Sequence, residues 1–416
     1  MVHLAERKSA SLVPNLKHVL LQFFDLDKLG KSQNIFTRVE SLPESTASQL
    51  VDTILTEFKD RHRDFENLLR KHYSMVALRN PKVNSLSEEK RMLLGAYYSN
   101  EYSLEAAALM NPSMVPSPEN ESRETNKSSF ILSLRSVGEG HISSIQFRIG
   151  SIDENGNLTI DPISDHMNSG DYRIITQNNG DITELTYKDC YSISERVIFP
   201  MTADESNGIE DARFVKFESG SYYGTYTAYD GYNISLKMIR TDDFQTFYIH
   251  KMMDGSFHHK GLALFPRKIN GMFVMTSRQD GENLYLMYSD DLSDWKKAEK
   301  ISEPKAPWEF IQLGNCGSPL ETDQGWILIT HGVGPMRKYV LSACLLDKND
   351  PSKVIGRLDQ PLLSPLESER NGYVPNVVYS CGSLKFNGEI YIPYAMSDYA
   401  SGFASIPIKK LLDHMN

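Results

Sequence analysis

The sequence predicts an all-β fold, a five-bladed β-propeller, with an α-helical extension at its N-terminus. Two observations support this prediction. Apolar residues recur at helical spacing only within the first hundred residues, whereas from about residue 110 the chain shows short strands, Gly and Asn turns and frequent aromatic residues. The expected boundaries are a helical extension over residues 1–104 and a propeller domain over residues 105–416.

The helical extension is predicted mainly from residues 47–80. Apolar residues recur there at the spacing of one buried helix face: Leu50, Ile54, Leu55, Phe58, Phe65, Leu68 and Leu69. Further along, Ser87 precedes an acidic turn and is expected to cap another helix. Helices that pack on the main domain or on another subunit explain this segment without a catalytic role.

The propeller is predicted from a repeated strand. Each copy places a Gly-containing turn before an aromatic-rich alternating strand that ends in a polar or charged residue. The copies are residues 126–138, 218–230, 269–280, 323–332 and 386–398. The turn glycines of the last four, Gly220, Gly271, Gly325 and Gly388, are 51, 54 and 63 residues apart. Periods near 50 residues of short strands are typical of propeller blades, so five copies predict five blades.

The ends of the repeated strands predict a polar pocket. If this strand is an inner one, its last residues converge near the axis: Arg135, Asp230, Arg278, His331 and Asp398. Aromatic rings, carboxylates, Arg, Asn and His together are typical of a carbohydrate site, because rings stack on sugars while charged and amide groups bind hydroxyls. A non-catalytic sugar-binding module would share these features.

Composition excludes several other classes of partner. The 416 residues carry a formal net charge of −10, whereas a nucleic-acid binder needs a basic face. No run of 18 apolar residues predicts a membrane helix, and the N-terminus does not read as a signal peptide. Four scattered cysteines suit a reducing compartment, so we expect a cytoplasmic protein. No cofactor or metal is expected, because His258 and His259 lack a spaced set of carboxylates.

The segment "NGIEDARF", residues 207–214, contains the candidate acid. Asp211 could protonate a leaving glycosidic oxygen, with Arg213 nearby to orient the site. An E-D-x-R string is weak support when taken alone, since such strings are usually surface salt-bridge partners. Its position before an aromatic strand of the repeat strengthens the assignment.

This segment resembles the G-x-E-D-P-R signature of glycoside hydrolase family 130, the β-mannoside phosphorylases and β-mannosidases. The likeness covers roughly residues 105 to 408 and continues through residues 260–275, 314–333, 345–357, 372–382 and 391–398. The resemblance implies a five-bladed propeller and a mannose-containing oligosaccharide as substrate. It also implies homo-oligomer contacts for a helical extension such as this one, which lies outside the likeness.

The resemblance also implies roles for individual residues. Asp211 would be the general acid and would pass its proton through a substrate hydroxyl. Asn111, Asp230, Lys260 and Asp398 would help to bind the sugar. The chain departs from the signature at Ala212, where the family usually has Pro, and this slightly loosens the loop.

The sequence favours a hydrolase over a phosphorylase. Glu321 and Glu282 stand where phosphorylases of the family do not usually have acidic residues, and a carboxylate would repel an incoming phosphate. The chain also resembles the hydrolytic subgroup of the family, which acts on β-1,2-linked mannosides. We therefore expect an inverting β-mannosidase that releases mannose, with Glu321 as the base and Glu282 as the next candidate. Arg135 and His331 keep a β-mannoside phosphorylase, which would form mannose 1-phosphate, as the alternative.

Overall fold

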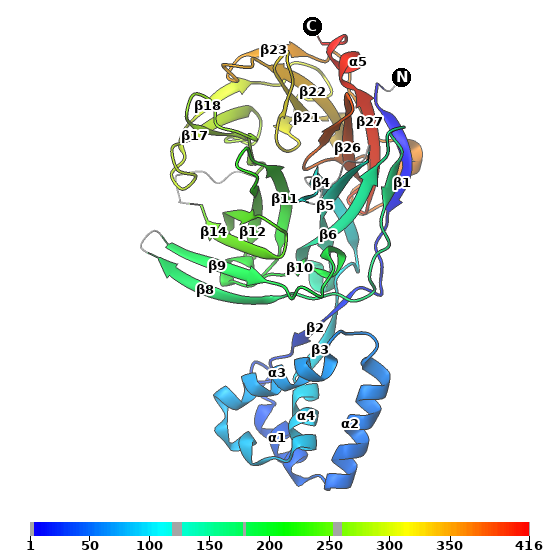
Figure 1. Ribbon diagram of the computed structural model, residues 1–416, viewed down its shortest axis with the longest axis vertical. Coiled ribbons are helices and arrows are strands. Elements are labelled where there is room, and N and C mark those ends of the chain that lie inside the picture. The colour runs from blue at the N-terminus through cyan, green and yellow to red at the C-terminus, as the bar shows by residue number, and fades with distance from the viewer. Residues whose placement is uncertain (1–3, 119–126, 178–179, 253–259, 416) are drawn as a thin grey trace. The chain divides into compact units, whose positions relative to one another are not determined.

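The computed structural model describes residues 4–118, 127–177, 180–252 and 260–415 (Figure 1). The chain divides into two compact units. A helical unit contains residues 16–104 and 164–168, and a β-unit contains residues 1–15, 105–163 and 169–416. In the described part of the chain, no helix has both the length and the apolar character needed to cross a membrane.

The helical unit has four α-helices and a two-stranded sheet. The helices are α1 (Ser32–Ser41), α2 (Glu44–Phe58), α3 (Phe65–Arg79) and α4 (Glu88–Tyr97), and the strands are β2 (Val19–Phe23) and β3 (Ser99–Ser103). Ser87 caps α4 as predicted, because its hydroxyl accepts a hydrogen bond from the backbone N–H of Lys90. Leu69 of α3 and Leu94 of α4 lie in the core of this unit.

Within the described residues, the β-unit is built from five antiparallel sheets (Figure 1). They follow chain order except that β8 and β9 of the second sheet precede β10 of the first, and that β1 belongs to the fifth. The first contains β4 (Ala108–Pro116), β5 (Ser128–Val137), β6 (Ser143–Ile152), β7 (Leu158–Ile160) and β10 (Val197–Ile198). The second contains β8 (Asp171–Gln177), β9 (Gly180–Thr186), β11 (Ile209–Lys216), β12 (Tyr222–Tyr229), β13 (Ile234–Thr241) and β14 (Thr246–Lys251). The third contains β15 (Ala263–Leu264), β16 (Phe273–Ser277), β17 (Leu284–Ser289) and β18 (Lys296–Ser302).

The last two sheets complete the unit. The fourth contains β19 (Gln312–Asn315), β20 (Leu320–Glu321), β21 (Trp326–Gly334), β22 (Lys338–Leu346) and β23 (Val354–Arg357). The fifth contains β1 (Glu6–Leu12), β24 (Val378–Tyr379), β25 (Leu384–Phe386), β26 (Glu389–Met396) and β27 (Ala400–Pro407), after which helix α5 (Ile408–Leu412) follows. The mostly β character predicted for this part of the chain is therefore right.

Strand β1 corrects the predicted helical extension. It pairs antiparallel with β27, with Glu6 opposite Ser405 and Leu12 opposite Ser401, so both ends of the chain belong to one sheet. Arg7 anchors the strand through an ion pair of 2.7 Å to Glu369. This short polar segment lacks the apolar alternation that marks a half-buried strand, so the sequence pattern gave no sign of it.

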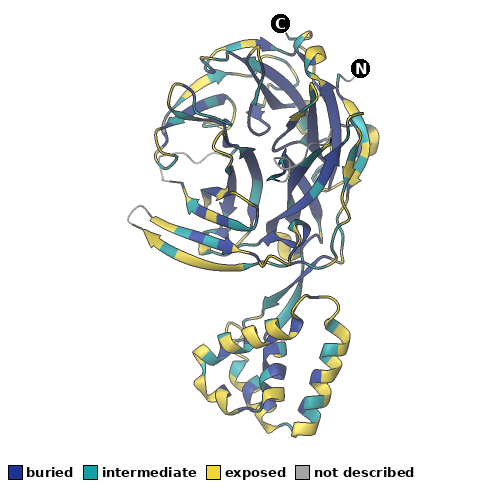
Figure 2. Ribbon diagram, viewed as in Figure 1, coloured by how far each residue is buried: buried dark blue, intermediate teal, exposed yellow. Residues whose placement is uncertain are grey.

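Aromatic residues of the β-unit lie mainly between its sheets. Phe147 of β6 stacks on Phe247 of β14, and Tyr222 of β12 contacts Phe244 with 4.9 Å between ring centroids. Most strands of this unit are buried along their length, whereas β8 is largely exposed (Figure 2). Tyr222 and Tyr226, which belong to a repeated strand, are therefore core residues and do not line a sugar site.

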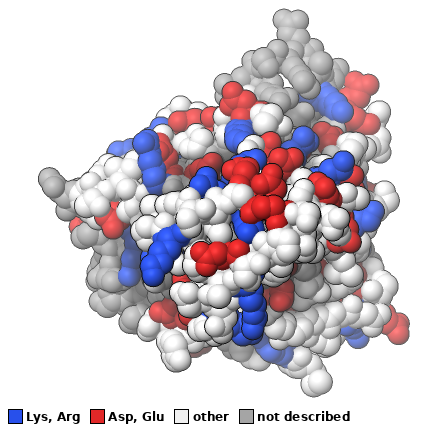
Figure 3. Space-filling model, turned by 90° about the horizontal axis from the view of Figure 1, so that it is seen from below, with Lys and Arg blue, Asp and Glu red and all other residues white. Residues whose placement is uncertain are grey.

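Acidic and basic side chains are interspersed on the face seen in Figure 3.

Candidate active site

Two β-bulges bring Asn111 and Asp211 together. The pairing of β4 with β5 shifts register between Met110 and Ser113, and the pairing of β11 with β12 shifts between Glu210 and Arg213. Within these bulges Asn111 has φ +50° and Asp211 has φ +56°, a region that Asn and Asp adopt more readily than most residues. A bulge redirects a side chain, and here Nδ2 of Asn111 donates a hydrogen bond of 2.6 Å to Oδ1 of Asp211.

Two guanidinium groups flank the Asp211 carboxylate. Nη1 of Arg135 lies 3.6 Å from Oδ1, and Nη2 of Arg213 lies 3.8 Å from Oδ2. Arg213 is held by hydrogen bonds from its Nη1 to the Asp211 carbonyl, at 2.9 Å, and from its Nη2 to the Tyr379 hydroxyl, at 2.6 Å. Burial alone would raise the pKa of Asp211, but these two cations and the Asn111 hydrogen bond outweigh burial and hold the pKa below its ordinary value.

Glu210, to which the sequence analysis assigned no role, links two cations of the site. Its Oε1 accepts a hydrogen bond of 2.8 Å from Nη2 of Arg135, and its Oε2 accepts one of 2.6 Å from Nζ of Lys260. Its side chain is 17 % exposed, so these charge-assisted bonds are only partly screened by water. Arg135 therefore contacts both neighbouring carboxylates of the "GIEDARF" segment.

Asp398 adds another carboxyl group to this cluster. It lies in the turn between β26 and β27 with φ +50°. Burial, and then the nearby charge of Asp211, raise the pKa of Asp398 to about 6. The environment thus pushes the proton affinities of the two aspartates apart, which is an arrangement that enzymes use to give acidic groups separate roles.

His331 and Arg278 form a second part of the site. Nε2 of His331 accepts hydrogen bonds from Arg278 Nη1, at 3.3 Å, and from Gln312 Nε2, at 2.8 Å. Burial, together with the charges of Arg278 and Arg213, lowers the pKa of His331 far below its ordinary value. The imidazole is therefore neutral, and it positions Arg278 as an acceptor rather than adding a cation of its own.

Polar atoms without partners mark the same region. Among the described residues, buried nitrogen or oxygen atoms that lack a hydrogen-bond partner include Asn111 Oδ1, Arg135 Nε, Arg213 Nε, Arg278 Nε and Asn315 Oδ1. Unsatisfied buried polar groups are costly, so these five atoms leave donors and acceptors that a polar ligand could satisfy. The sequence analysis missed Asn315, which no pattern distinguishes from an ordinary strand-end residue.

Asp230 does not join the other strand ends. Its carboxylate accepts hydrogen bonds from the backbone N–H groups of Tyr232 and Asn233, at 2.7 and 2.6 Å, and from the Asn233 side chain. The group thus stabilises its own turn, as Asp commonly does at such positions. Of the five predicted strand ends, Arg135, Arg278, His331 and Asp398 interact with the Asp211 cluster.

Neither predicted base contacts Asp211 in the part of the chain that the structure describes. Glu321 pairs with Arg267 at 2.8 Å and sits opposite Trp326, five residues before His331 on β21, which corresponds to about 17 Å along the strand. The Arg267 hydrogen bond lowers the pKa of Glu321. Glu282 is exposed in a turn capped by Asp280. His258 and His259 lie outside the described residues.

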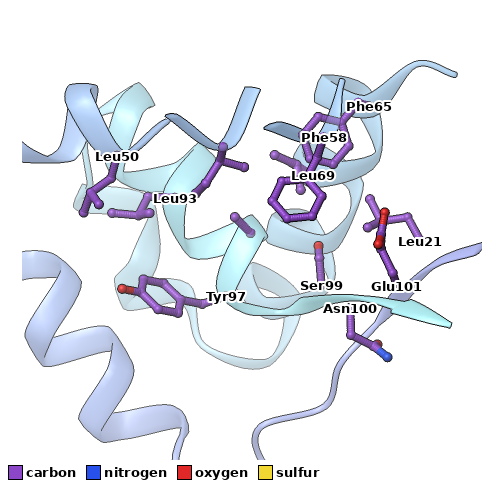
Figure 4. Close-up of a pocket in the computed structure, with 12 residues that line it drawn as sticks. Leu21, Leu50, Phe58, Phe65, Leu69, Leu93, Tyr97, Ser99, Asn100 and Glu101 are labelled. Carbon is purple, nitrogen blue, oxygen red and sulfur yellow. The ribbon is translucent and has the colours of Figure 1, made fainter. Parts of the chain in front are cut away.

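The helical unit contains a separate pocket of about 410 Å³ (Figure 4). It is lined mostly by apolar side chains, including Leu50, Phe58, Phe65 and Leu93, with Ser99 and Glu101 at one side. None of the predicted site residues lies in it, so we place the active site in the β-unit.

Comparisons with known proteins agree with a mannoside-active site. A family model for glycoside hydrolase family 130, described as beta-1,4-mannooligosaccharide phosphorylase, matches residues 178–416. A 1,2-beta-oligomannan phosphorylase from Thermoanaerobacter sp. (strain X514) is 38% identical over 217 residues, which cover 50% of this chain and 72% of the relative. A Beta-1,2-mannobiose phosphorylase from the same organism is 38% identical over 211 residues, covering 50% of this chain and 69% of the relative.

A solved structure resembles the fold. The Beta-1,2-Mannobiose phosphorylase from Listeria innocua superimposes with a TM-score of 0.56 at 17% identity, covering 75% of this chain and 92% of that one.

These comparisons overturn the expected hydrolase. The family description and both relatives are phosphorylases, so an inverting β-mannosidase with a glutamate base is the wrong reading. For Glu321 the structure supplies a physical reason, because its carboxylate is paired with Arg267 at 2.8 Å and lies opposite Trp326, about 17 Å along β21 from His331.

Proposed function

This chain belongs to glycoside hydrolase family 130, and we propose that it is a β-mannoside phosphorylase that converts β-1,2-linked mannosides and phosphate into mannose 1-phosphate. The relatives of this chain are named as phosphorylases, so we assign it the same type of reaction. Such a reaction needs a site that binds an anionic nucleophile in place of a base that activates water.

The strongest support for this proposal is the charge environment of Arg278. Arg135 and Lys260 share the carboxylate of Glu210, but the described residues give Arg278 no carboxylate partner. Its Nη1 is held by neutral His331, and its Nε has no partner. A cation that is oriented by a neutral group and not balanced by an acid is suited to bind phosphate.

In the proposed reaction, Asp211 supplies the proton. The phosphate oxygen forms a bond to the anomeric carbon while the bond to the glycosidic oxygen breaks on the opposite face. The leaving oxygen takes the proton that Asp211 provides, which passes through a sugar hydroxyl. Because phosphate is already a nucleophile, the step requires no group to deprotonate water.

We also propose that the five sheets are the blades of a propeller. The five sheets follow the chain in order apart from β1, β8 and β9, and β1 joins the fifth sheet, which also contains strand β27. Pairing the two ends of the chain in one sheet is a physical way to close a ring of blades.

The direct test is the dependence of the reaction on phosphate. The purified chain is incubated with β-1,2-mannobiose in phosphate-free buffer, phosphate is then added, and both products are measured. We expect mannose 1-phosphate to form only after the addition, and we expect Asp211→Asn to reduce its rate by about 10²–10⁴-fold. Release of free mannose without phosphate would overturn the proposal, and sugar binding without any turnover would favour a binding module.

A further inference from the structure

Glu210 has a geometry that the proposed reaction does not yet explain. It directly precedes the proposed acid, and each of its oxygens accepts a hydrogen bond from a different cation, Arg135 at 2.8 Å and Lys260 at 2.6 Å. These cations come from separate segments, since Arg135 lies on β5 and Lys260 precedes β15. With both oxygens engaged, Glu210 is poorly placed to give a proton to a sugar, so it does not duplicate Asp211.

The charges around Asp211 explain why a second carboxylate is needed. A general acid must carry a proton when the leaving group departs, and nearby cations favour loss of that proton. The charged and polar groups nearest Asp211 come from five segments: Asn111 of β4, Arg135 of β5, Arg213 of β11, Lys260 before β15 and Asp398 of the β26–β27 turn. Weaker electrostatic interactions link Asp211 to His331, Cys316, Tyr379 and Cys381. Three of these groups are cations, and Glu210 bonds to two of the three.

We propose that Glu210 is a positioning residue that fixes Arg135 and Lys260 beside Asp211 and offsets part of their charge, which limits how strongly these cations favour the ionised form of Asp211. This inference rests on the proposed function. In a merely structural role, loss of the carboxylate would reduce stability and overall rate but leave the pH dependence of the rate unchanged. In the proposed role, the same loss leaves two cations uncompensated and changes the pH at which the acid ionises.

The test compares pH profiles of kcat/KM for phosphorolysis of β-1,2-mannobiose at constant phosphate. In Glu210→Gln the uncompensated cations favour ionised Asp211. The alkaline limb of the profile should therefore move to lower pH by about one unit relative to the wild type. Glu210→Asp keeps the charge with a shorter reach. Its alkaline limb should stay near that of the wild type even if its rate is lower.

Lys260→Met supplies the opposite change. It removes a cation, so the alkaline limb should move to higher pH, and the Glu210→Gln/Lys260→Met double variant should lie between the two single variants. Glu184→Gln is the matched control, because Glu184 pairs with Arg173 on the neighbouring edge strand and its side chain is 15 % exposed, close to the 17 % of Glu210. That control should leave the profile unchanged.

The outcomes separate this inference from the proposed function. A wild-type chain without phosphate-dependent turnover overturns the function and the inference with it. If the wild type is active but Glu210→Gln and Lys260→Met both keep its alkaline limb, the role of Glu210 is overturned and the proposed function stands. If Glu210→Gln does not fold, the pH profiles of Glu210→Asp and Lys260→Met test the inference. An alkaline limb that does not move in Lys260→Met would then contradict the charge balance.

Discussion

Asn111 and Asp211 lie a hundred residues apart in the chain, yet each occupies a β-bulge, each has a positive φ, and a hydrogen bond of 2.6 Å joins them. Strands β4 and β11 each lie at one end of their sheet, so the bulges place the two side chains at neighbouring sheet ends. Bulges are frequent next to active sites, where they redirect a side chain.

The bulge at Asn111 predicts an unusual order of stability for two variants. Asn111→Ala and Asn111→Gly both remove the hydrogen bond to Asp211, so both should lose most of their activity. At φ +50°, however, Ala carries a steric cost of about 1 kcal/mol that Gly avoids. Chemical denaturation should therefore find the Gly variant more stable than the Ala variant, the reverse of the usual order in a strand. Equal stability would mean that the backbone relaxes at this position.

Arg278 should determine the affinity for phosphate. Arg278→Met removes a charge-assisted bond, so the KM for phosphate should rise by about 10- to 100-fold, while the KM for β-1,2-mannobiose should change little. Arg278→Lys should recover part of the loss, because it restores the charge without the planar donor set. Steady-state kinetics with each substrate varied separately give both constants. Equal increases in both would place Arg278 in the sugar site instead.

Glu321→Gln tests the corrected assignment. Glu321 pairs with Arg267 and Lys348 at 2.8 and 3.8 Å, and its side chain is 33% exposed. We expect kcat to remain within about twofold of the wild type and stability to fall by less than about 1 kcal/mol, as is usual for partly exposed ion pairs. A loss of activity of a hundredfold with intact folding would restore a catalytic role for this residue.

The repeat made part of this site predictable. Equivalent positions of repeated strands fall at equivalent places in each sheet, so Arg135, Arg278, His331 and Asp398 could be grouped from spacing alone. The same reasoning failed for Asp230, because a local turn competes for its carboxylate and satisfies it. Spacing locates a side chain along a strand but does not reveal which partner it will take.

Other features lay beyond pattern reasoning. A bulge adds a residue that breaks alternation, so Asn111 was identified only through the family resemblance, and the charged string around Asp211 gave no sign that the two residues meet. Glu321 attracted a functional interpretation because an acidic residue is unusual there in phosphorylases of the family. In the structure, however, β20 places it opposite Trp326, the first residue of β21 and five residues from His331. The paired cations of Glu210 come from distant segments, and one sequence contains no sign of such a contact.

Replacing Asp398 by Asn should increase stability in a pH-dependent way and reduce activity. The folded chain raises the pKa of this carboxyl from its ordinary value of 3.8 to about 6, so the folded state binds the proton more tightly than the unfolded state. Stability therefore falls as pH rises from about 4 through 6, where the folded chain must ionise a buried carboxyl close to Asp211. Asp398→Asn removes this cost.

The Asp398→Asn variant should be more stable than the wild type by on the order of 2 kcal/mol at pH 8, and by about half of that at pH 5. Urea denaturation at both pH values measures the two differences. Glu184→Gln should show no such dependence on pH and serves as the control. Phosphorolysis should fall in the same Asp398→Asn sample if this group binds the sugar, because stability and function then oppose each other at one side chain. A gain of stability that is the same at pH 5 and pH 8 would contradict the raised pKa, since a packing effect alone does not titrate.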